Sequence, residues 1–217
     1  MLNEPNWDEL WKDKTNSYED KLAVKHITAL EAVAYLETKE KILTIGDFGC
    51  GHGNVLKELA KLNKYKLFAY DQSDFAKSSL EKENIKFEQC NLLELNKKNI
   101  NLDVAIVTDV LEHFFQPKKV LDGLKNCKYI IVLVPNFNEL TQRIQVLFGN
   151  IPFQMRQKRG GHVYWFNINE FYNVCENDFE IIKELHTFPN KISKIKILNS
   201  LPNLFANQFC AILRNKQ

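Results

Sequence analysis

The chain has 217 residues, of which 45% are hydrophobic and 26% are charged, and its formal net charge is +2 at pH 7. This length suits one α/β domain with a sizeable core, and the small net charge excludes the broad basic field of indiscriminate nucleic-acid binders. The five cysteines are scattered without a C-x-x-C pair, which argues against zinc knuckles and a disulfide framework. No apolar run approaches the ~20 residues of a membrane span, and the N-terminus lacks a signal-peptide pattern. We expect a cytoplasmic protein, a single domain over residues 1–217, with no nucleic-acid or membrane partner.

The first 38 residues are predicted to be helical. Trp7, Leu10 and Trp11 share one face at helical spacing, and residues 19–38 form an amphipathic pattern without Gly or Pro. The aromatic face either packs on the body of the protein or forms a lid over a binding pocket. We treat residues 1–38 as an N-terminal helical cap.

A glycine-rich turn comes next. An apolar run ends in Asp47, and glycines then stand at every second position, Gly49, Gly51 and Gly53. A helix-like pattern begins directly after them, so we predict a buried strand, a tight turn and a helix N-terminus. Glycine permits φ > 0 and lets a ligand approach the main chain. The turn should therefore present backbone N–H groups to a ligand.

The spacing of this turn differs from that of a dinucleotide fingerprint. The fingerprint reads G-x-G-x-x-G and binds a pyrophosphate at the helix N-terminus, whereas Asn54 stands in the place of its third glycine. Asp47 would also put a negative charge beside that pyrophosphate. A ligand with an ammonium group and a sulfonium suits the acid better, so a nicotinamide dehydrogenase is disfavoured.

The second and third predicted strands, residues 66–71 and 85–88, end in polar side chains. Asp71 lies about 20 residues beyond the glycines, where nucleotide-binding βαβ units place a carboxylate that accepts hydrogen bonds from both ribose hydroxyls. Its alternative role is a turn or a helix cap, because Ser73 and Asp74 follow. Asn91 comes soon after the third strand, and residues 94–101 are predicted to be a loop.

The fourth predicted strand, residues 102–109, leads into the string Asp-Val-Leu-Glu-His. A helix starting here would place Asp109, Glu112 and His113 on one face, because their spacing is i, i+3 and i+4. The three side chains are consistent with a divalent-cation site, or with His113 as a general base. They are also consistent with a plain helix start that Asp109 caps. Open α/β sheets bind ligands at the carboxyl ends of their strands, where Asp47, Asp71 and Asp109 all stand.

Pro117 opens a further helix, and residues 129–134 form a fifth buried strand. Residues 136–168 are predicted to be an insertion over the acceptor site, with a helix at 137–149 and a basic loop at 150–163. The cations of this loop either bind a phosphate or other anion, or are simply solvated. Gly160 and Gly161 are a candidate hinge, and His162 is the second candidate base. The cations are Arg156, Lys158 and Arg159.

Residues 169–177 are predicted to be a helix, and residues 179–187 and 207–214 an antiparallel strand pair. Together these elements predict a doubly wound, seven-stranded, mostly parallel sheet with helices on both faces and an antiparallel last strand. Residues 40–135 would form the cofactor-binding core, and residues 169–217 the C-terminal part of the sheet.

The string D-x-G-x-G-x-G over residues 47–53 resembles motif I of the class I S-adenosylmethionine-dependent methyltransferases. The Asp-x-Leu-Glu-His string at 109–113 resembles motif IV of the small bacterial enzymes, the methionine-biosynthesis-like and ubiquinone-type O-methyltransferases. The likeness extends to the Gly-His-aromatic stretch at 161–166. In some relatives the matching acid, acid and His hold a divalent cation near the acceptor hydroxyl. Asn91 departs from the family, which usually has Asp beside the adenine amino group.

This resemblance implies a Rossmann-like methyltransferase fold and S-adenosylmethionine as the cofactor. It implies these cofactor-binding residues: Asp47, Gly49, Cys50, Gly51, Gly53, Asp71, Gln72, Asn91, Leu92 and Thr108. The candidate catalytic residues are His113, His162 and Asp109. The candidate substrate-binding residues are Arg156, Arg159 and Tyr164. A divalent cation would bind Asp109, Glu112 and His113.

We expect an O-methyltransferase whose acceptor is the hydroxyl of a sugar, a nucleotide sugar or a surface-polysaccharide precursor, with or without a phosphate group. The alternatives are a non-catalytic partner or regulatory protein that binds S-adenosylmethionine, and an N-methyltransferase of a small metabolite. Methylation of nucleic-acid bases is disfavoured, because no Asn/Asp-Pro-Pro-Tyr/Phe string follows the fourth strand. The protein is expected to be a monomer or a homodimer.

Overall fold

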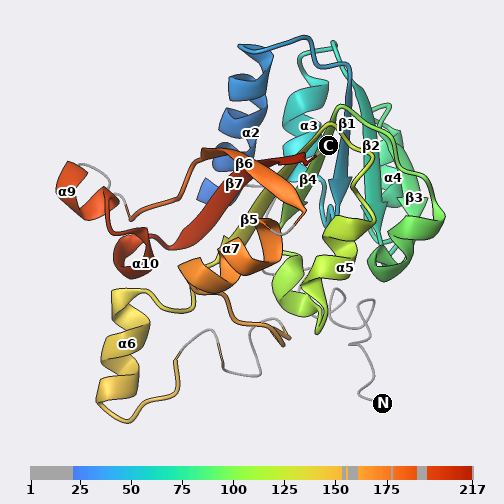
Figure 1. The fold of residues 1–217 in the computed structure, drawn as a ribbon. Coiled ribbons are helices and arrows are strands. Elements are labelled where there is room, and N and C mark those ends of the chain that lie inside the picture. The colour runs from blue at the N-terminus through green and yellow to red at the C-terminus, as the bar shows by residue number, and fades with distance from the viewer. Residues whose placement is uncertain (1–21, 153–154, 156–160, 177, 190–194, 217) are drawn as a thin grey trace.

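A computed structural model describes residues 22–152, 155, 161–176, 178–189 and 195–216. Within these residues all seven strands form one sheet in the order β3-β2-β1-β4-β5-β7-β6 (Figure 1). Neighbouring strands are parallel except where β7 pairs, because β7 is antiparallel to both β5 and β6. The strands are β1 Thr44–Phe48, β2 Lys66–Asp71, β3 Lys86–Gln89, β4 Val104–Thr108, β5 Tyr129–Pro135, β6 Phe179–Glu184 and β7 Gln208–Asn215. The predicted doubly wound sheet with an antiparallel last strand is confirmed.

Helices cover both faces of the sheet, as the sequence predicts. One face carries α2 Val24–Glu37, α3 Asn54–Ala60 and α4 Lys77–Glu81, and the other carries the 3₁₀ helix η1 Leu92–Lys97, α5 Pro117–Asp122 and α7 Ile168–Glu176. Strand β4 supplies both cores: Val104 and Ile106 pack in one cluster, and Ala105 and Val107 in the other. This follows from the alternation of side chains along a strand that is buried on both sides.

Helix α2 is part of the core. Ala29, Ala32 and Leu36 are fully buried in the cluster that includes α3 and the sheet. The described part of the predicted N-terminal cap is therefore a layer of the sandwich and not a lid. The remainder of that prediction, with Trp7, Leu10 and Trp11, lies outside the described residues.

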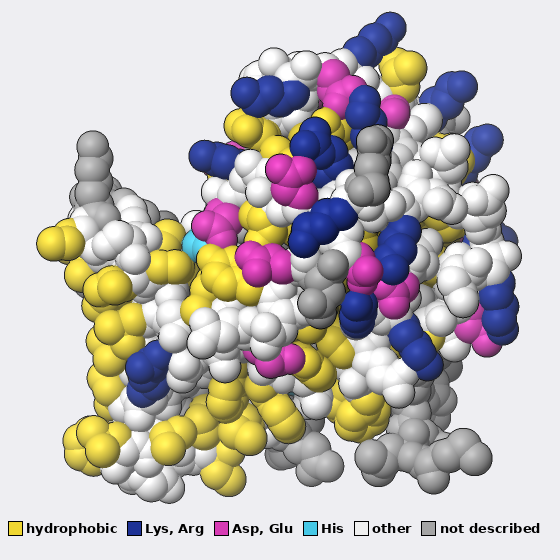
Figure 2. Space-filling model, viewed as in Figure 1, with side chains coloured by type: hydrophobic (Ala, Val, Ile, Leu, Met, Phe, Trp, Pro, Cys, Tyr) yellow, Lys and Arg dark blue, Asp and Glu magenta, His cyan; other side chains and the backbone are white. Residues whose placement is uncertain are grey.

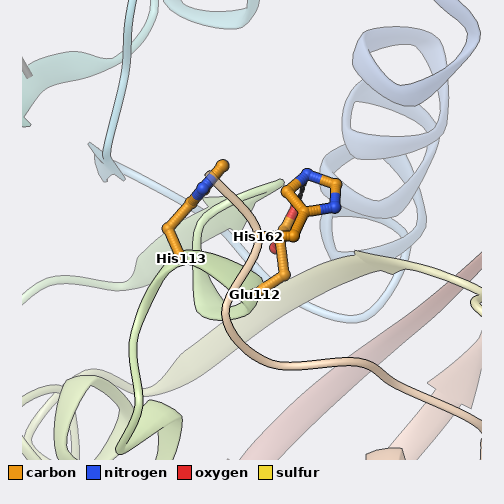
Figure 3. Close-up of side chains that lie close together, drawn as sticks. All are labelled: Glu112, His113 and His162. Carbon is orange, nitrogen blue, oxygen red and sulfur yellow. Dashed lines mark ion pairs between the residues drawn. The ribbon is translucent and has the colours of Figure 1, made fainter. Parts of the chain in front are cut away.

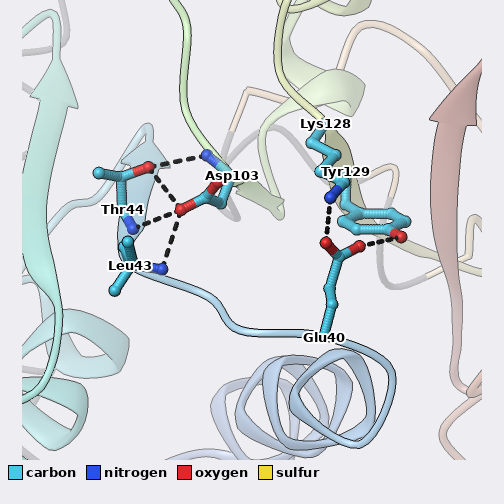
Figure 4. A network of polar contacts seen from close by, with 6 residues as sticks. All are labelled: Glu40, Leu43, Thr44, Asp103, Lys128 and Tyr129. Atoms are coloured by element: carbon cyan, nitrogen blue, oxygen red, sulfur yellow. Dashed lines mark hydrogen bonds and ion pairs between the residues drawn. The ribbon is translucent and has the colours of Figure 1, made fainter.

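Polar side chains connect the chain around the amino-terminal ends of β1, β4 and β5 (Figure 4). The predicted site lies at the opposite, carboxyl ends of these strands. Asp103 Oδ2 accepts hydrogen bonds from the N–H groups of Leu43 and Thr44, each at 2.9 Å, and from the Thr44 hydroxyl at 3.0 Å. Burial alone would raise the pKa of Asp103, but these donors outweigh it and lower the pKa. Glu40 accepts from the Tyr129 hydroxyl at 2.6 Å and pairs with Lys128. These bonds help to fix the register of β1, β4 and β5. The carboxyl ends of the three strands therefore lie side by side.

The remaining elements follow β4, β5 and β6. They are the short 3₁₀ helix η2 Leu111–His113, then α6 Leu140–Leu147, α9 Lys196–Asn199 and α10 Pro202–Phe205. Figure 1 shows α6 projecting from the body below α10. Within the described ranges no helix combines the length and the apolar character needed to cross a membrane. The predicted loop at 94–101 is partly helical, because Asn91 caps η1 by accepting a hydrogen bond from Leu93 N at 2.9 Å.

Candidate active site

The glycine turn after β1 requires its glycines for two reasons. Gly49, Gly51 and Gly53 have φ values of 78°, 51° and 70°, in the left-handed region that side chains disfavour. Space is also short, because a Cβ on Gly49 would lie 2.4 Å from Cγ2 of Val110. The turn therefore packs directly against the segment that follows β4.

The N–H groups of this turn are engaged with the protein, contrary to the sequence expectation. Gly49 N and Cys50 N donate to the Tyr70 carbonyl at 2.7 and 3.2 Å, and Gly51 N donates to Asp71 Oδ2 at 2.9 Å. The turn is thus tied to the end of β2 and does not offer these donors to a phosphate. This agrees with a ligand that has no pyrophosphate.

Asp71 has the turn role that the sequence allowed, and its position is compatible with the ribose role. Its Oδ1 accepts from Ser73 N at 3.0 Å, as in a turn, while Oδ2 holds Gly51. The side chain also lines the pocket at this edge of the sheet. That Asp71 accepts hydrogen bonds from the hydroxyls of a ribose remains a prediction.

An open pocket lies at the carboxyl ends of the strands, where open α/β sheets bind their ligands. It contains four predicted cofactor-binding residues, two predicted catalytic residues and two apolar residues that the sequence reasoning missed. The lining residues are, in that order, Gly49, Asp71, Gln72 and Leu92; Asp109 and His113; Val110 and Phe114.

Three other predicted cofactor-binding residues border this edge without lining the pocket. Cys50 is buried in the glycine turn, and burial raises the pKa of its thiol well above the ordinary value. Thr108 is the half-buried last residue of β4. Asn91 Oδ1 accepts from Gln72 Nε2 at 3.2 Å in addition to capping η1. Asn91 therefore helps to place Gln72 in the pocket wall.

Asp47 lies at the end of β1 and is only 2% exposed. Its Oδ1 has no hydrogen-bond partner among the described residues. Burial and then the charge of Asp71 raise the pKa of Asp47 to about 7, while Lys25 acts in the opposite direction. A buried carboxylate oxygen without a donor is costly, so this atom is suited to an ammonium group on a ligand.

Asp109 does not share a helical face with Glu112 and His113, and that prediction was wrong. Its φ is 52°, and helical structure begins only after it, at Leu111. Its carboxylate accepts from Lys25 Nζ at 2.7 Å and from Gln208 Nε2 at 2.9 Å. Both partners are residues that the sequence reasoning missed, because they lie 84 and 99 positions away and carry no local signal.

His162 takes the place predicted for Asp109 beside Glu112 and His113 (Figure 3). One ligand-type atom of each residue lies within 4.8 Å of the others. His162 Nε2 is 3.9 Å from Glu112 Oε1, and the two imidazole centroids are 5.0 Å apart. The main chain holds this arrangement, because the N–H groups of Val163 and Tyr164 donate to the Glu112 carbonyl at 2.9 and 3.0 Å.

Glu112 is the most deeply buried member of this cluster. Its side chain is 1% exposed, and neither carboxylate oxygen has a hydrogen-bond partner within the described part of the chain. Burial, followed by the negative charge of Asp109, raises the pKa of Glu112 well above its ordinary value. The cluster therefore combines two imidazoles with a carboxyl group that accepts no hydrogen bond from the described residues. These three groups can bind a divalent cation or transfer a proton.

The predicted substrate-binding residues are only partly described. Tyr164 is half-buried, its hydroxyl donates to Glu170, and burial and this bond raise the pKa of Tyr164 to about 12. Arg156 and Arg159 lie outside the described residues, so their proposed contact with an anion stays a prediction.

Comparison with known proteins identifies the family. Residues 18–184, more than half of the chain, match the family model described as a methyltransferase domain. No curated protein matches in sequence. Among solved structures, the chain is similar to a SAM-dependent methyltransferase from Archaeoglobus fulgidus, with 17% identity, a TM-score of 0.63, and 97% of this chain and 100% of that chain covered.

Two further structures share the fold. A magnesium protoporphyrin IX methyltransferase from Synechocystis with bound SAH (S-adenosylhomocysteine) is 14% identical, with a TM-score of 0.65 over 97% of this chain and 95% of that one. A small RNA methyltransferase is 17% identical, with a TM-score of 0.64 over 92% of this chain and 27% of that one. The family match, the fold and the pocket agree: the chain belongs to the methyltransferase domain family and is an S-adenosylmethionine-dependent methyltransferase.

Proposed function

We propose that this enzyme methylates a hydroxyl group of a small molecule, and that the acceptor is a sugar, a nucleotide sugar or a surface-polysaccharide precursor. The observation that carries the proposal is the cluster of Glu112, His113 and His162 at the edge of the pocket. His113 belongs to both features, since it lines the same pocket as Gly49 and Asp71. An alcohol must lose a proton as it attacks, and these groups are suited to remove it.

The cofactor supplies a methyl group that is already activated on a sulfonium, so the protein has to position the acceptor and handle its proton. In our proposal the unpartnered Oδ1 of Asp47 accepts from the ammonium group of the cofactor. Asp71, on the pocket wall, accepts from the ribose hydroxyls. Gln72, Asn91 and Leu92 border the adenine.

His113 is our candidate general base because its imidazole faces the pocket. Asp109 lies in the same pocket wall, but its two carboxylate oxygens accept hydrogen bonds from Lys25 and Gln208. We therefore give Asp109 a structural role in the pocket wall. His162 lies against Glu112 and orients the cluster.

The same three side chains form a candidate site for a divalent cation. One carboxylate and two imidazoles fit Mn²⁺, Fe²⁺ or Zn²⁺ better than Mg²⁺, which prefers oxygen ligands. A cation there would compensate the buried Glu112 and polarise an acceptor hydroxyl. His162 replaces Asp109 in the ligand set predicted from the sequence.

The test measures methyl transfer from labelled S-adenosylmethionine to a panel of sugar phosphates and nucleotide sugars. A short RNA is included because one similar structure is a small RNA methyltransferase. With the acceptor found, we expect His113→Ala to lower kcat by about 100-fold, the usual contribution of a general base. His162→Ala and Glu112→Gln should lower kcat as well, with unchanged affinity for S-adenosylhomocysteine.

His186→Ala is the matched control, because that imidazole accepts from Cys210 N in the C-terminal strand pair and is not part of the pocket lining. Calorimetry with Mn²⁺ or Zn²⁺ alone tests the cation site, and Glu112→Gln should abolish the binding heat. Full activity of both His113→Ala and His162→Ala would contradict the assignment of the base. Methylation of the RNA alone would overturn the acceptor class.

A further inference from the structure

Helix α6 buries a polar side chain and exposes apolar side chains to solvent, the reverse of the usual arrangement. Gln142 is buried, with 6% exposure, and its Oε1 has no hydrogen-bond partner among the described residues. Meanwhile Leu147 is 79% exposed and Phe148 is 76% exposed. An amphipathic helix normally buries its apolar face, so this face is arranged to meet an apolar environment outside the protein.

The exposed apolar side chains continue beyond this helix, and Figure 2 shows them gathered on the side of the molecule where Figure 1 places α6. A second group lies around α9. Asn136 connects the two chain segments, because its Nδ2 donates to the carbonyls of Pro202, Asn203 and Ala206. We call the following residues the apolar face: Leu140, Ile144, Val146, Leu147, Phe148, Ile151, Ile195, Ile197 and Leu201.

Net positive charge is concentrated in the segments that carry the apolar face. Residues 140–165 contain four Lys and Arg, residues 188–206 contain three, and neither segment contains Asp or Glu. The rest of the chain has the other 22 Lys and Arg and all 27 Asp and Glu, a net charge of −5. An exposed apolar face carried by segments of net positive charge matches the surface of a membrane that contains anionic lipids.

Other occupants fit these observations less well. A second copy of the chain would place this face against itself about a two-fold axis, and two segments of net positive charge would then meet the same two segments. A nucleic acid would match the charge, but nucleic-acid sites use aromatic stacking, whereas most of the apolar face is aliphatic. Helix α6 has eight residues, about 12 Å, which is far short of the ~30 Å of a bilayer core.

We propose that the apolar face docks this enzyme on the surface of a bilayer containing anionic phospholipid, with α6 lying in the interface. The inference does not rest on the acceptor class proposed above. It differs from the expectation drawn from sequence alone, which included no membrane partner.

The test is flotation of the full chain with vesicles of phosphatidylcholine, with and without phosphatidylglycerol, at low and high ionic strength. We expect binding only to the anionic vesicles, weakened by salt. The double variant Leu147→Ser/Phe148→Ser should bind them at least about tenfold more weakly, since two interfacial apolar anchors are removed. Lys191→Glu/Lys194→Glu should weaken binding to the anionic vesicles similarly.

The matched control is Leu43→Ser/Leu62→Ser, which removes two apolar side chains that are 47% and 55% exposed elsewhere on the molecule. It should bind vesicles as the wild type does. Calorimetry with S-adenosylhomocysteine should give the same affinity for all variants, which shows that they are folded. The proposal is overturned if the wild type binds no vesicles, if the control loses as much binding as Leu147→Ser/Phe148→Ser, or if that variant only converts a dimer to a monomer. Preferential binding of a short RNA over anionic vesicles would also overturn it.

Discussion

Single residues of the glycine turn show how local conformation and packing act together. Gly49 has φ +78° and lies against the β-branched Val110, whereas Gly149 has φ +71° with nothing within 4 Å of an added Cβ. A side chain at either position would strain the backbone, but only at Gly49 would it also clash with a neighbouring side chain. The pair therefore separates the cost of conformation from the cost of packing.

We expect Gly49→Ala to lower the free energy of unfolding by about 2–4 kcal/mol, from left-handed strain plus overpacking. Gly149→Ala should lower it by only about 1 kcal/mol, from strain alone. Urea denaturation of both variants measures the difference. Equal losses would show that Val110 moves aside without cost.

At the scale of elements, the bonds of Asp103 hold β1 beside β4. One carboxylate oxygen collects two main-chain N–H groups and the Thr44 hydroxyl, while the Thr44 hydroxyl accepts from Asp103 N at 2.8 Å. Because β1 and β4 carry Asp47 and the residues before Asp109, their register decides how far apart these acids lie. The polar network at the amino-terminal ends of the strands thus helps to fix the geometry of the pocket at their carboxyl ends.

We expect Asp103→Ala to lower the free energy of unfolding at pH 7 by about 2 kcal/mol, because several hydrogen bonds to one charged group are lost. The folded-state pKa of Asp103 lies below its ordinary value of 3.8. Its contribution is therefore present above about pH 4 and is lost as the pH falls through the folded-state pKa.

Denaturation of the wild type and Asp103→Ala across pH tests this, and their difference should shrink in acid. The control is Glu94→Ala, which removes an exposed ion pair with Lys97 and should change stability by less than about 0.5 kcal/mol. A constant difference between Asp103→Ala and the wild type at all pH values would contradict the role of the charge.

At the scale of the whole molecule, the enzyme keeps two acids, Asp47 and Glu112, buried near the carboxyl ends of its strands. The folded-state pKa of Asp47 is about 7, against an ordinary value of 3.8. The folded protein therefore holds the proton more tightly than the unfolded chain, and the stability that this provides falls as the pH rises from about 4 to 7. The burial of Glu112 acts in the same direction. In our proposal, this buried carboxylate lowers the free energy of unfolding at neutral pH and accepts a hydrogen bond from the ammonium group of the cofactor.

We expect Asp47→Asn to raise the free energy of unfolding relative to the wild type by about 2–4 kcal/mol at pH 8 and by much less at pH 5. Affinity for S-adenosylhomocysteine should show the opposite pattern. In the wild type it should weaken as the pH falls below 7, and in Asp47→Asn it should be weak at every pH. Thermal denaturation and calorimetry measure the two quantities, and Asp74→Asn, at an exposed position, is the control. An unchanged affinity for S-adenosylhomocysteine in Asp47→Asn would remove Asp47 from the cofactor site.

Sequence by itself determined the order of the elements, the glycine turn and the acids at the strand ends. These depend on local rules: side chains alternate along a strand, and glycine tolerates φ > 0. They were sufficient to predict the sheet, and the resemblance of the glycine turn to motif I of the methyltransferases added the cofactor.

Only the tertiary structure decided which side chains meet. His162 lies beside Glu112 and His113 because the segment after α6 donates main-chain hydrogen bonds to the Glu112 carbonyl. Asp109 instead accepts hydrogen bonds from Lys25 and Gln208. The apolar pattern of α6 was likewise visible in the sequence, but periodicity shows that a helix has an apolar face and not which way that face turns. Contacts between distant segments are set by how the sheet and its helices pack, and no local pattern records them.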